Sequence, residues 1–270
     1  MFKGKRLGRL CIKYHLNSGS EGRVWLVNNE FGKTFALKDY KNPSRHMKNE
    51  INNHNTIGIH QNILTPIDHA IKFIDNDNEN IKNTEPTAII YEYYEDGDLV
   101  NNYEEFKTFS VEKYMAVMSG LWKGVAHCHD KGICHRDIKP QNILYNKHKN
   151  TVILCDFGMS LPGDKMILAG TSLYYSAPEC YERKEHPPYN YICDIWSAGL
   201  VFISMKWGSQ ILDHTIHDSK LRELGYIYLK KKYHNEWTAL PKEYQEILRS
   251  TIVPNPHDRC DANDVINMLA

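Results

Sequence analysis

The sequence has no apolar run that approaches the roughly 20 residues of a membrane-spanning helix. It also has no net charge, because 33 basic residues balance 33 acidic ones, so no overall field favours nucleic acid or an anionic membrane. Basic residues open the chain without an apolar run behind them, which argues against a signal peptide. We therefore expect neither membrane insertion nor direct nucleic-acid binding.

The sequence also lacks a disulfide framework. Its seven cysteines are scattered and odd in number, which predicts free thiols in a reducing compartment. Asn42-Pro43-Ser44 is the only Asn-x-Ser/Thr triplet, and its proline blocks glycosylation. We expect an intracellular protein of the cytoplasm or nucleus. Cys128-His129 and Cys134-His135 look like metal ligands. We favour a different role for this segment, based on the acidic residues Asp137 and Asp156 that follow it.

Two short acidic signals, His135-Arg136-Asp137 and Asp156-Phe157-Gly158, flank a predicted β-hairpin. Its strands are the apolar runs 143–145 and 152–155, and residues 146–150 form a polar turn. The hairpin would bring Asp137, Asn142 and Asp156 to one end. Two carboxylates and an amide suit a divalent cation whose other ligands are water and phosphate oxygens.

The spacing HRD-x-K-x-x-N followed by DFG resembles the catalytic core of eukaryotic-type protein kinases. The resemblance implies that Asp137 orients a substrate hydroxyl and accepts its proton. Lys139 would balance charge on the moving phosphoryl group, while Asn142 and Asp156 would hold Mg²⁺ or Mn²⁺. Lys139 and a hydroxyl in the Gly-Thr-Ser of residues 170–172 resemble serine/threonine kinases rather than tyrosine kinases.

Residues 14–27 alternate around a glycine-bearing turn and predict two strands joined by a tight loop. Gly19, Gly22 and Val24 match the kinase G-x-G-x-x-G-x-V pattern, while Asn17 stands at the first glycine. We expect Asn17 to preserve the turn because asparagine tolerates a positive φ. Lys38 ends a strand that resembles V-A-I-K, which implies contact with the α- and β-phosphates of ATP. The resemblance adds to the nucleotide-binding residues Leu16, Ala36 and Leu144.

A short helix should follow Pro43, with Ser44 as its cap. Glu50 is the only acid in it, and so the only candidate for an ion pair with Lys38. His54 stands one turn later, where the family usually packs an apolar side chain.

Residues 75–86 read as a polar surface turn, and 88–99 as the last strand of the small lobe with the hinge. By position, the resemblance makes Tyr91 the gatekeeper. Glu92 and Tyr94 would offer backbone groups to adenine, and Asp98 would face the ribose.

Helical periodicity predicts a helix over residues 110–130, with Ser110 as its cap. This helix precedes the catalytic hairpin in the chain. Farther on, the Ala-Pro-Glu of residues 177–179 and the D-x-W-S-x-G of 194–199 match kinase signals. The resemblance implies a structural ion pair between Glu179 and Arg259. Residues 209–237 match the family poorly and read as connecting and helical surface.

We therefore expect an α+β bilobal protein-kinase-like fold in a single domain over residues 1–270. Its small, mostly β lobe would cover about 1–92, its hinge 92–97, and its mostly helical lobe about 98–270. ATP would lie in the cleft, and protein substrates would supply serine or threonine hydroxyls. The resemblance covers roughly residues 10–265, and the chain is also similar to compact kinases of large insect DNA viruses. A pseudokinase scaffold and a small-molecule phosphotransferase of kinase-like fold remain as alternatives.

Two features predict how such an enzyme would behave. Gln141 and Ser204 replace acids that usually select arginine before the target hydroxyl, so we expect no strict arginine requirement. Ile167 and Leu168 stand where an activation-segment phosphate would be accepted, and neither carries a hydroxyl. We therefore expect activity without a phosphate on this segment, with Arg136 meeting Asp164 or solvent.

Overall fold

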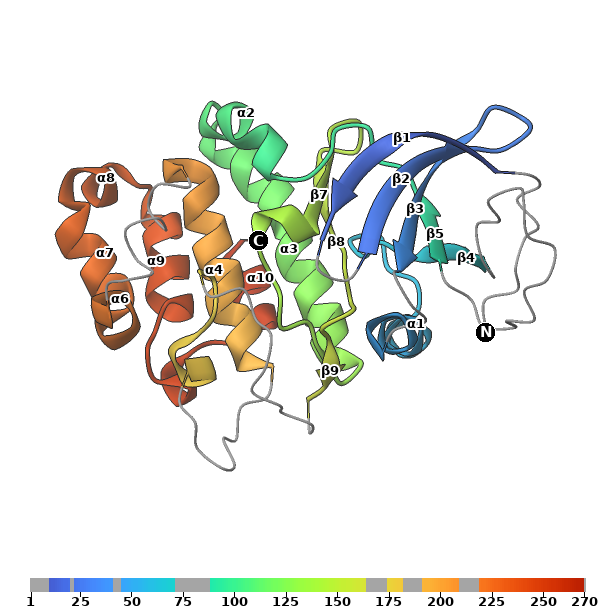
Figure 1. The fold of residues 1–270 in the computed structure, drawn as a ribbon. Helices are drawn as coiled ribbons and strands as arrows, with labels where there is room; N and C mark the ends of the chain where they lie inside the picture. Colours follow the sequence, from blue (N-terminus) through green and yellow to red (C-terminus); the bar gives the residue numbers. More distant parts are fainter. Residues whose placement is uncertain are drawn as a thin grey trace.

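The computed structural model describes residues 10–19, 22–40, 45–70, 88–163, 174–181, 191–208 and 219–269. The N-terminal part of the described chain is built mainly from strands and the C-terminal part mainly from helices (Figure 1). This arrangement confirms the predicted α+β bilobal fold.

The N-terminal sheet has five antiparallel strands in the order β1-β2-β3-β5-β4. β2 and β3 pair without a register shift, and their β-branched and aromatic residues fit a pleated, half-buried surface. The strands are β1 (Cys11–Ser18), β2 (Gly22–Asn28), β3 (Thr34–Tyr40), β4 (Pro66–Ala70) and β5 (Ala88–Glu92).

Two positions of the glycine-bearing loop differ in what they require. A side chain at Gly22 would bring its Cβ within 2.2 Å of the backbone oxygen of Asp39, so only glycine allows β2 this close to β3. Asn17 lies within β1. Among the described residues other than glycine, positive φ occurs at Arg136, Asn150 and Asp156. Asn17 therefore does not use the positive φ that asparagine tolerates: β1 still pairs with β2 through it, with a register shift between His15 and Asn17.

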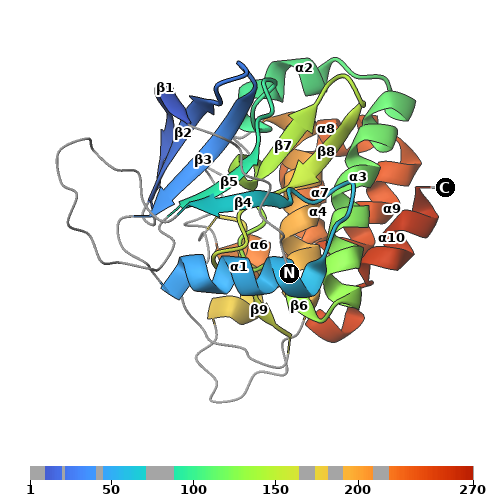
Figure 2. The same cartoon turned by 90° about the vertical axis from the view of Figure 1, so that its right-hand side faces the viewer.

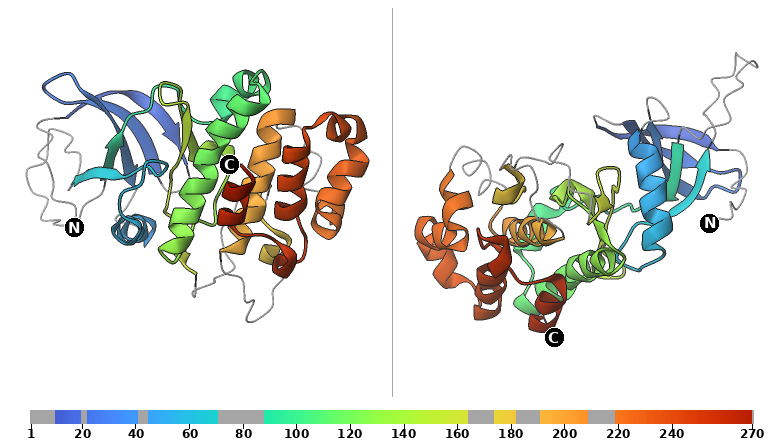
Figure 3. Two further views of the ribbon diagram at one scale, coloured as in Figure 1. Left: turned by 180° about the vertical axis from the view of Figure 1, so that it is seen from behind. Right: turned by 90° about the horizontal axis from the view of Figure 1, so that it is seen from below.

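Helix α1 (Arg45–Ile57) lies along one face of this sheet (Figure 2, Figure 3). Met47 of α1 is buried in a cluster with Tyr40, Ile89 and Tyr91 of the sheet. Apolar burial therefore fixes the helix against β3 and β5. With 13 residues α1 is not the short helix that we expected. The predicted cap, Ser44, lies outside the described residues.

The C-terminal part is organised around α3 (Val111–Asp130) and α4 (Ile192–Trp207). The Ser110 side chain accepts a hydrogen bond from the backbone N–H of Lys113, which confirms the predicted cap of α3. Most α4 residues are buried, as expected of a helix that is apolar on all sides. The other helices are α2 (Tyr103–Lys107), α6 (Ser219–Leu224), α7 (Tyr226–Lys232), α8 (His234–Ala239), α9 (Lys242–Thr251) and α10 (Ala262–Met268), with short 3-10 turns η1 (Val100–Asn102), η2 (Pro140–Asn142), η3 (Pro178–Tyr181) and η4 (Pro256–Asp258).

Two small two-stranded sheets lie next to α3. The predicted hairpin is present as β7 (Ile143–Asn146) and β8 (Thr151–Leu154), which pair antiparallel. β6 (Ile133–Cys134) pairs with β9 (Leu161–Pro162), and residues 135–142, called the catalytic loop below, run from β6 to β7. Gly120 of α3 allows β8 to approach, because a Cβ there would lie 2.5 Å from Thr151 Oγ1.

The segment that we read as helical surface contributes to the core. Leu221, Tyr228, Leu229 and Trp237 of α6, α7 and α8 are buried in the main cluster of the C-terminal part. For the described residues 219–237 the helical surface is confirmed, because α6, α7 and α8 are helices with mostly exposed residues, but the four buried side chains were not predicted. Across the described ranges, no helix combines the length and apolar character that crossing a membrane requires.

Candidate active site

Lys38 connects three elements at the junction of the two lobes. From β3, its Nζ lies 2.8 Å from Glu50 Oε2 of α1 and 2.7 Å from Asp156 Oδ1 beyond β8. The predicted ion pair between Lys38 and Glu50 is therefore present. Burial opposes the charged amine, but the Asp156 and Glu50 carboxylates outweigh it and raise the pKa of Lys38 well above its ordinary value. Lys38 is thus a permanent cation at the wall of the site.

Glu50 is buried and also receives two tyrosine hydroxyls. Tyr91 of β5 donates to Glu50 Oε1 at 2.5 Å, and Tyr40 of β3 donates to Glu50 Oε2. The carboxylate therefore has both oxygens hydrogen-bonded, as a buried charge requires. Tyr91 thus contacts the carboxylate of α1 as well as the cavity, and the contact to α1 was not predicted from the sequence.

Asp156 has a left-handed backbone, with φ of 67°. Such a conformation costs a residue with a side chain about 1–2 kcal/mol, so its surroundings must hold it. Burial would raise the pKa of Asp156, but Lys38 outweighs burial and lowers it to about 2. The side chain keeps about a third of its surface exposed, at 35%. Asp156 is therefore an ionised carboxylate that faces the cavity.

Asp137 is held by its neighbours in the catalytic loop. Lys139 Nζ donates to Asp137 Oδ2 at 2.6 Å, and Asn142 Nδ2 donates to the same oxygen at 2.9 Å. The Asn142 amide also donates to the backbone oxygen of Asp137 at 2.8 Å. These contacts place Asp137 beside Asn142, as the predicted hairpin requires, and beside Lys139, with the Asp137 side chain only 9% exposed.

Asp194, buried at the start of α4, holds the backbone of the catalytic loop. Its carboxylate accepts hydrogen bonds from the backbone N–H groups of His135 and Arg136 at 2.7 and 2.8 Å. Arg136 has a positive φ of 69°, so these bonds hold a second strained backbone beside the site. The Arg136 side chain donates to the backbone oxygen of Met159 at 3.2 Å. We had expected it near Asp164 or solvent, and Asp164 lies outside the described residues.

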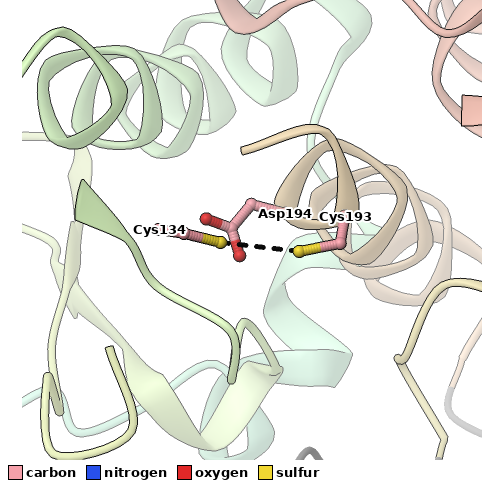
Figure 4. A group of neighbouring side chains, drawn as sticks. All are labelled: Cys134, Cys193 and Asp194. Carbon is pink, nitrogen blue, oxygen red and sulfur yellow. Dashed lines mark hydrogen bonds between the residues drawn. The ribbon is translucent and has the colours of Figure 1, made fainter. Parts of the chain in front are cut away.

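Cys134, Cys193 and Asp194 form a buried cluster that could be mistaken for a metal site (Figure 4). The two sulfur atoms lie 3.5 Å apart. Asp194, however, already accepts the two backbone hydrogen bonds from His135 and Arg136, and His129 Nε2 lies 3.0 Å from its Oδ2. We therefore assign Asp194 to holding the catalytic loop.

Every residue that the sequence analysis assigned to the site lines one of two adjoining cavities, of about 390 and 460 Å³. The first lies between the sheet and residues 92–98, and the second lies beside Gly19 and Gly22 and reaches Asp137. The first is lined by Leu16, Asn17, Val24, Ala36, Lys38, Glu50, Tyr91, Glu92, Tyr94, Asp98, Asn142, Leu144 and Asp156; the second adds Gly19, Gly22, Asp137 and Lys139.

Some lining residues were missed by sequence reasoning. Leu64 and Cys155 border the first cavity, Tyr174 borders the second, and Gln141 borders both. Gln141 was read only as a substrate-selecting position. Leu64 lies just before β4, where its apolar character was the only available signal.

The predicted structural ion pair between Glu179 and Arg259 is also present. Arg259 Nη1 and Nη2 donate to the two Glu179 oxygens at 2.6 and 3.1 Å. This bidentate contact is buried and joins η3 to the residue after η4. It lies in the helical lobe and has a structural role.

Comparison with known proteins agrees with this geometry. The family model described as protein kinase domain matches residues 12–269. The chain belongs to the protein kinase family. This kinase domain is 26% identical over 94% of its length to calcium-dependent protein kinase 5 of Plasmodium berghei (strain Anka). It is 29% identical over 96% of its length to serine/threonine-protein kinase SRK2C of Arabidopsis thaliana. It spans 44% of the Plasmodium protein and 74% of the Arabidopsis protein.

Proposed function

We propose that this kinase domain transfers the γ-phosphoryl group of ATP to serine or threonine hydroxyls of proteins. The observation that carries the proposal is the position of Lys38 Nζ, which lies within 2.8 Å of carboxylate oxygens of both Glu50 and Asp156. This arrangement places a fixed cation and an ionised carboxylate in the cavity where phosphates would enter. Membership of the family and the names of its relatives support the same activity.

The donor set fits a nucleotide and a hard divalent cation. Asn142 and Asp156 offer oxygen ligands at one wall of the cavity, as Mg²⁺ or Mn²⁺ prefers. When bound, such an ion neutralises charge on the phosphate oxygens. Lys38 would hold the α- and β-phosphates, with Gly19 and Gly22 above them. The backbone of Glu92 and Tyr94 would meet adenine, and burial raises the pKa of Asp98 beside the proposed ribose position.

Asp137 would orient the substrate hydroxyl and accept its proton, and Lys139 would balance charge on the transferred group. The 2.6 Å contact between Lys139 and Asp137 supports a pair that acts on the same atoms. Because phosphoryl transfer requires little covalent chemistry from the protein, positioning and charge stabilisation would supply most of the rate enhancement. Lys139, two residues after Asp137, favours serine and threonine over tyrosine.

Two other functions fit parts of the chain. A pseudokinase scaffold would keep the fold, but the ion pairs among Lys38, Glu50 and Asp156 argue for retained chemistry. A small-molecule phosphotransferase could share Asp137 and Asn142, but the buried contact between Glu179 and Arg259 favours a protein kinase. We also propose that the enzyme acts inside the cell, for which the seven free cysteines are the support.

Purified protein, labelled ATP and a generic basic protein would test the proposal. Phosphoserine and phosphothreonine in the hydrolysed protein are expected. No label in protein while ATP binds would support a pseudokinase, and label only in metabolites from a cell extract would support a small-molecule phosphotransferase. Either result would overturn the proposal.

A further inference from the structure

Helix α1 carries a row of polar side chains toward the segment that follows Asp156. His46, Asn49 and Asn53 are spaced by three and four residues, so they share one helix face. Asn53 is buried, at 4% exposure. A polar residue in this position needs hydrogen-bond partners.

Those partners are backbone oxygen atoms just after Asp156. Asn49 Nδ2 donates to the oxygens of Gly158 and Ser160 at 3.0 and 2.6 Å. Asn53 Nδ2 donates to the oxygens of Phe157 and Ser160 at 3.2 and 2.9 Å. His46 Nδ1 lies 3.4 Å from the same Gly158 oxygen. Two amides thus make four hydrogen bonds to the segment 157–160.

This segment needs external support because Asp156 has a left-handed backbone. The Phe157 ring is buried between His54 and His135, with both ring centroids at 4.8 Å. Ring packing fixes the Phe157 side chain, but these ring contacts give no hydrogen bonds to the backbone of segment 157–160. Arg136 supplies one such bond, to the Met159 oxygen, and the two asparagines supply four more, which tie the segment to the helix that carries Glu50.

We propose that Asn49 and Asn53 are positioning residues that clamp segment 157–160 to α1 and so keep Asp156 beside Lys38. The inference rests on the proposed kinase function for its consequence, since Asp156 would hold the divalent cation. The clamp itself is a property of the chain without nucleotide. Loss of the clamp should therefore affect both backbone protection and cation use.

The test compares Asn49→Ala/Asn53→Ala with a matched control, Asn52→Ala/Asn55→Ala. Asn52 and Asn55 are exposed on the same helix, so the control repeats the change in helix propensity without touching the clamp. Amide hydrogen exchange of the nucleotide-free proteins is measured first. We expect exchange in peptides from 157–163 to rise about tenfold in the clamp variant and to stay unchanged in the control.

Initial rates are then measured against Mg²⁺ concentration at saturating ATP. The Mg²⁺ concentration for half-maximal rate should rise several-fold in the clamp variant, whereas a purely structural role would lower only the amount of active enzyme. Unchanged exchange in 157–163, or an equal rise throughout the chain, would overturn the proposal.

If the double variant does not fold, Asn49→Ala decides by the same measurements, because Asn49 is only half-buried. If the wild-type chain transfers no phosphoryl group, the proposed function fails, and the exchange experiment still decides the clamp.

Discussion

Tyr91 donates its hydroxyl hydrogen to Glu50 Oε1 at 2.5 Å and so links β5 to α1. The ring also lines the first cavity. One side chain therefore limits the depth of the proposed nucleotide site and holds the carboxylate that pairs with Lys38.

Tyr91→Phe should lower the free energy of unfolding by about 2 kcal/mol, because it removes a hydrogen bond to a buried charge and keeps the ring. Tyr244→Phe is the matched control, since Tyr244 donates to the neutral backbone oxygen of Val111 at 3.3 Å. Thermal unfolding should separate the two by several degrees. An equal loss in both variants would show that the hydrogen bond to the buried Glu50 stabilises the fold no more than one to a neutral backbone oxygen.

Asp137→Ala and Asp156→Ala should each lower the rate of phosphoryl transfer by about 10²–10³-fold or more, because each removes a different part of the charge-stabilising apparatus. Asp130→Ala, at the exposed end of α3, is the control and should keep the wild-type rate. Circular dichroism checks that all variants are folded. Near-native turnover in a folded Asp137 or Asp156 variant would show that the site is assigned wrongly.

His54 makes stability depend on pH. Its two ring nitrogens are buried and have no hydrogen-bond partner among the described residues. Burial lowers the pKa of His54 to about 4, Glu50 and Asp156 act in the opposite direction, and Lys38 and His135 add to the lowering. The unfolded chain, with an ordinary pKa of about 6.5, therefore takes up a proton that the folded chain refuses. Stability is full above about pH 6.5 and falls as the pH approaches 4.

His54→Leu should remove this dependence and raise stability by roughly 2 kcal/mol at pH 5, and it replaces two unsatisfied nitrogens with an apolar side chain. Thermal unfolding of both proteins from pH 7.5 to 4.5 is the measurement. His148→Leu, in the exposed turn after β7, accounts for the loss of one imidazole. Parallel curves for wild type and His54→Leu would contradict the prediction.

Short-range patterns predicted the catalytic hairpin, because Asp137, Asn142 and Asp156 are close in sequence to the strands that carry them. The Lys38–Glu50 ion pair was also predictable, since α1 offers one acid. The tyrosine contacts to Glu50 were not, because they depend on how β3 and β5 lie relative to α1. Asn49 and Asn53 gave no signal in the sequence, since hydrophobic periodicity cannot reveal that backbone oxygens cover polar residues.

Gln141 and Ser204 stand at two positions where acids usually select arginine, although Glu95, Asp96 and Asp98 remain nearby, and this leads to a prediction about substrates. Gln141 is exposed and borders both cavities, while Ser204 is buried and donates to the backbone oxygen of Val201. A peptide library should therefore show weak selection, or none, for arginine two residues before the target hydroxyl. Gln141→Glu should increase that selection because it restores a carboxylate. Strong arginine selection by the wild-type chain would refute the prediction.

Activity should not require a phosphate on the activation segment. Ile167 and Leu168, at the expected acceptor positions, carry no hydroxyl. The backbone around Asp156 already has other support, because Arg136 donates to the oxygen of Met159, and Asn49 and Asn53 hold segment 157–160. A phosphate usually supplies such order by pairing with an arginine.

Phosphatase treatment tests this directly. Purified enzyme is treated until mass spectrometry finds no phosphate on residues 159–171, and initial rates are compared with a mock-treated sample. We expect less than about a twofold change, because hydrogen bonds to uncharged backbone oxygens do not depend on modification. Ser160→Ala is a second check, because Ser160 is the only hydroxyl-bearing residue from Met159 to Gly170 that could accept a phosphate. Its buried hydroxyl also donates to the backbone oxygen of His135. Loss of most activity on treatment, restored by rephosphorylation of the segment, would show that a phosphate does order it.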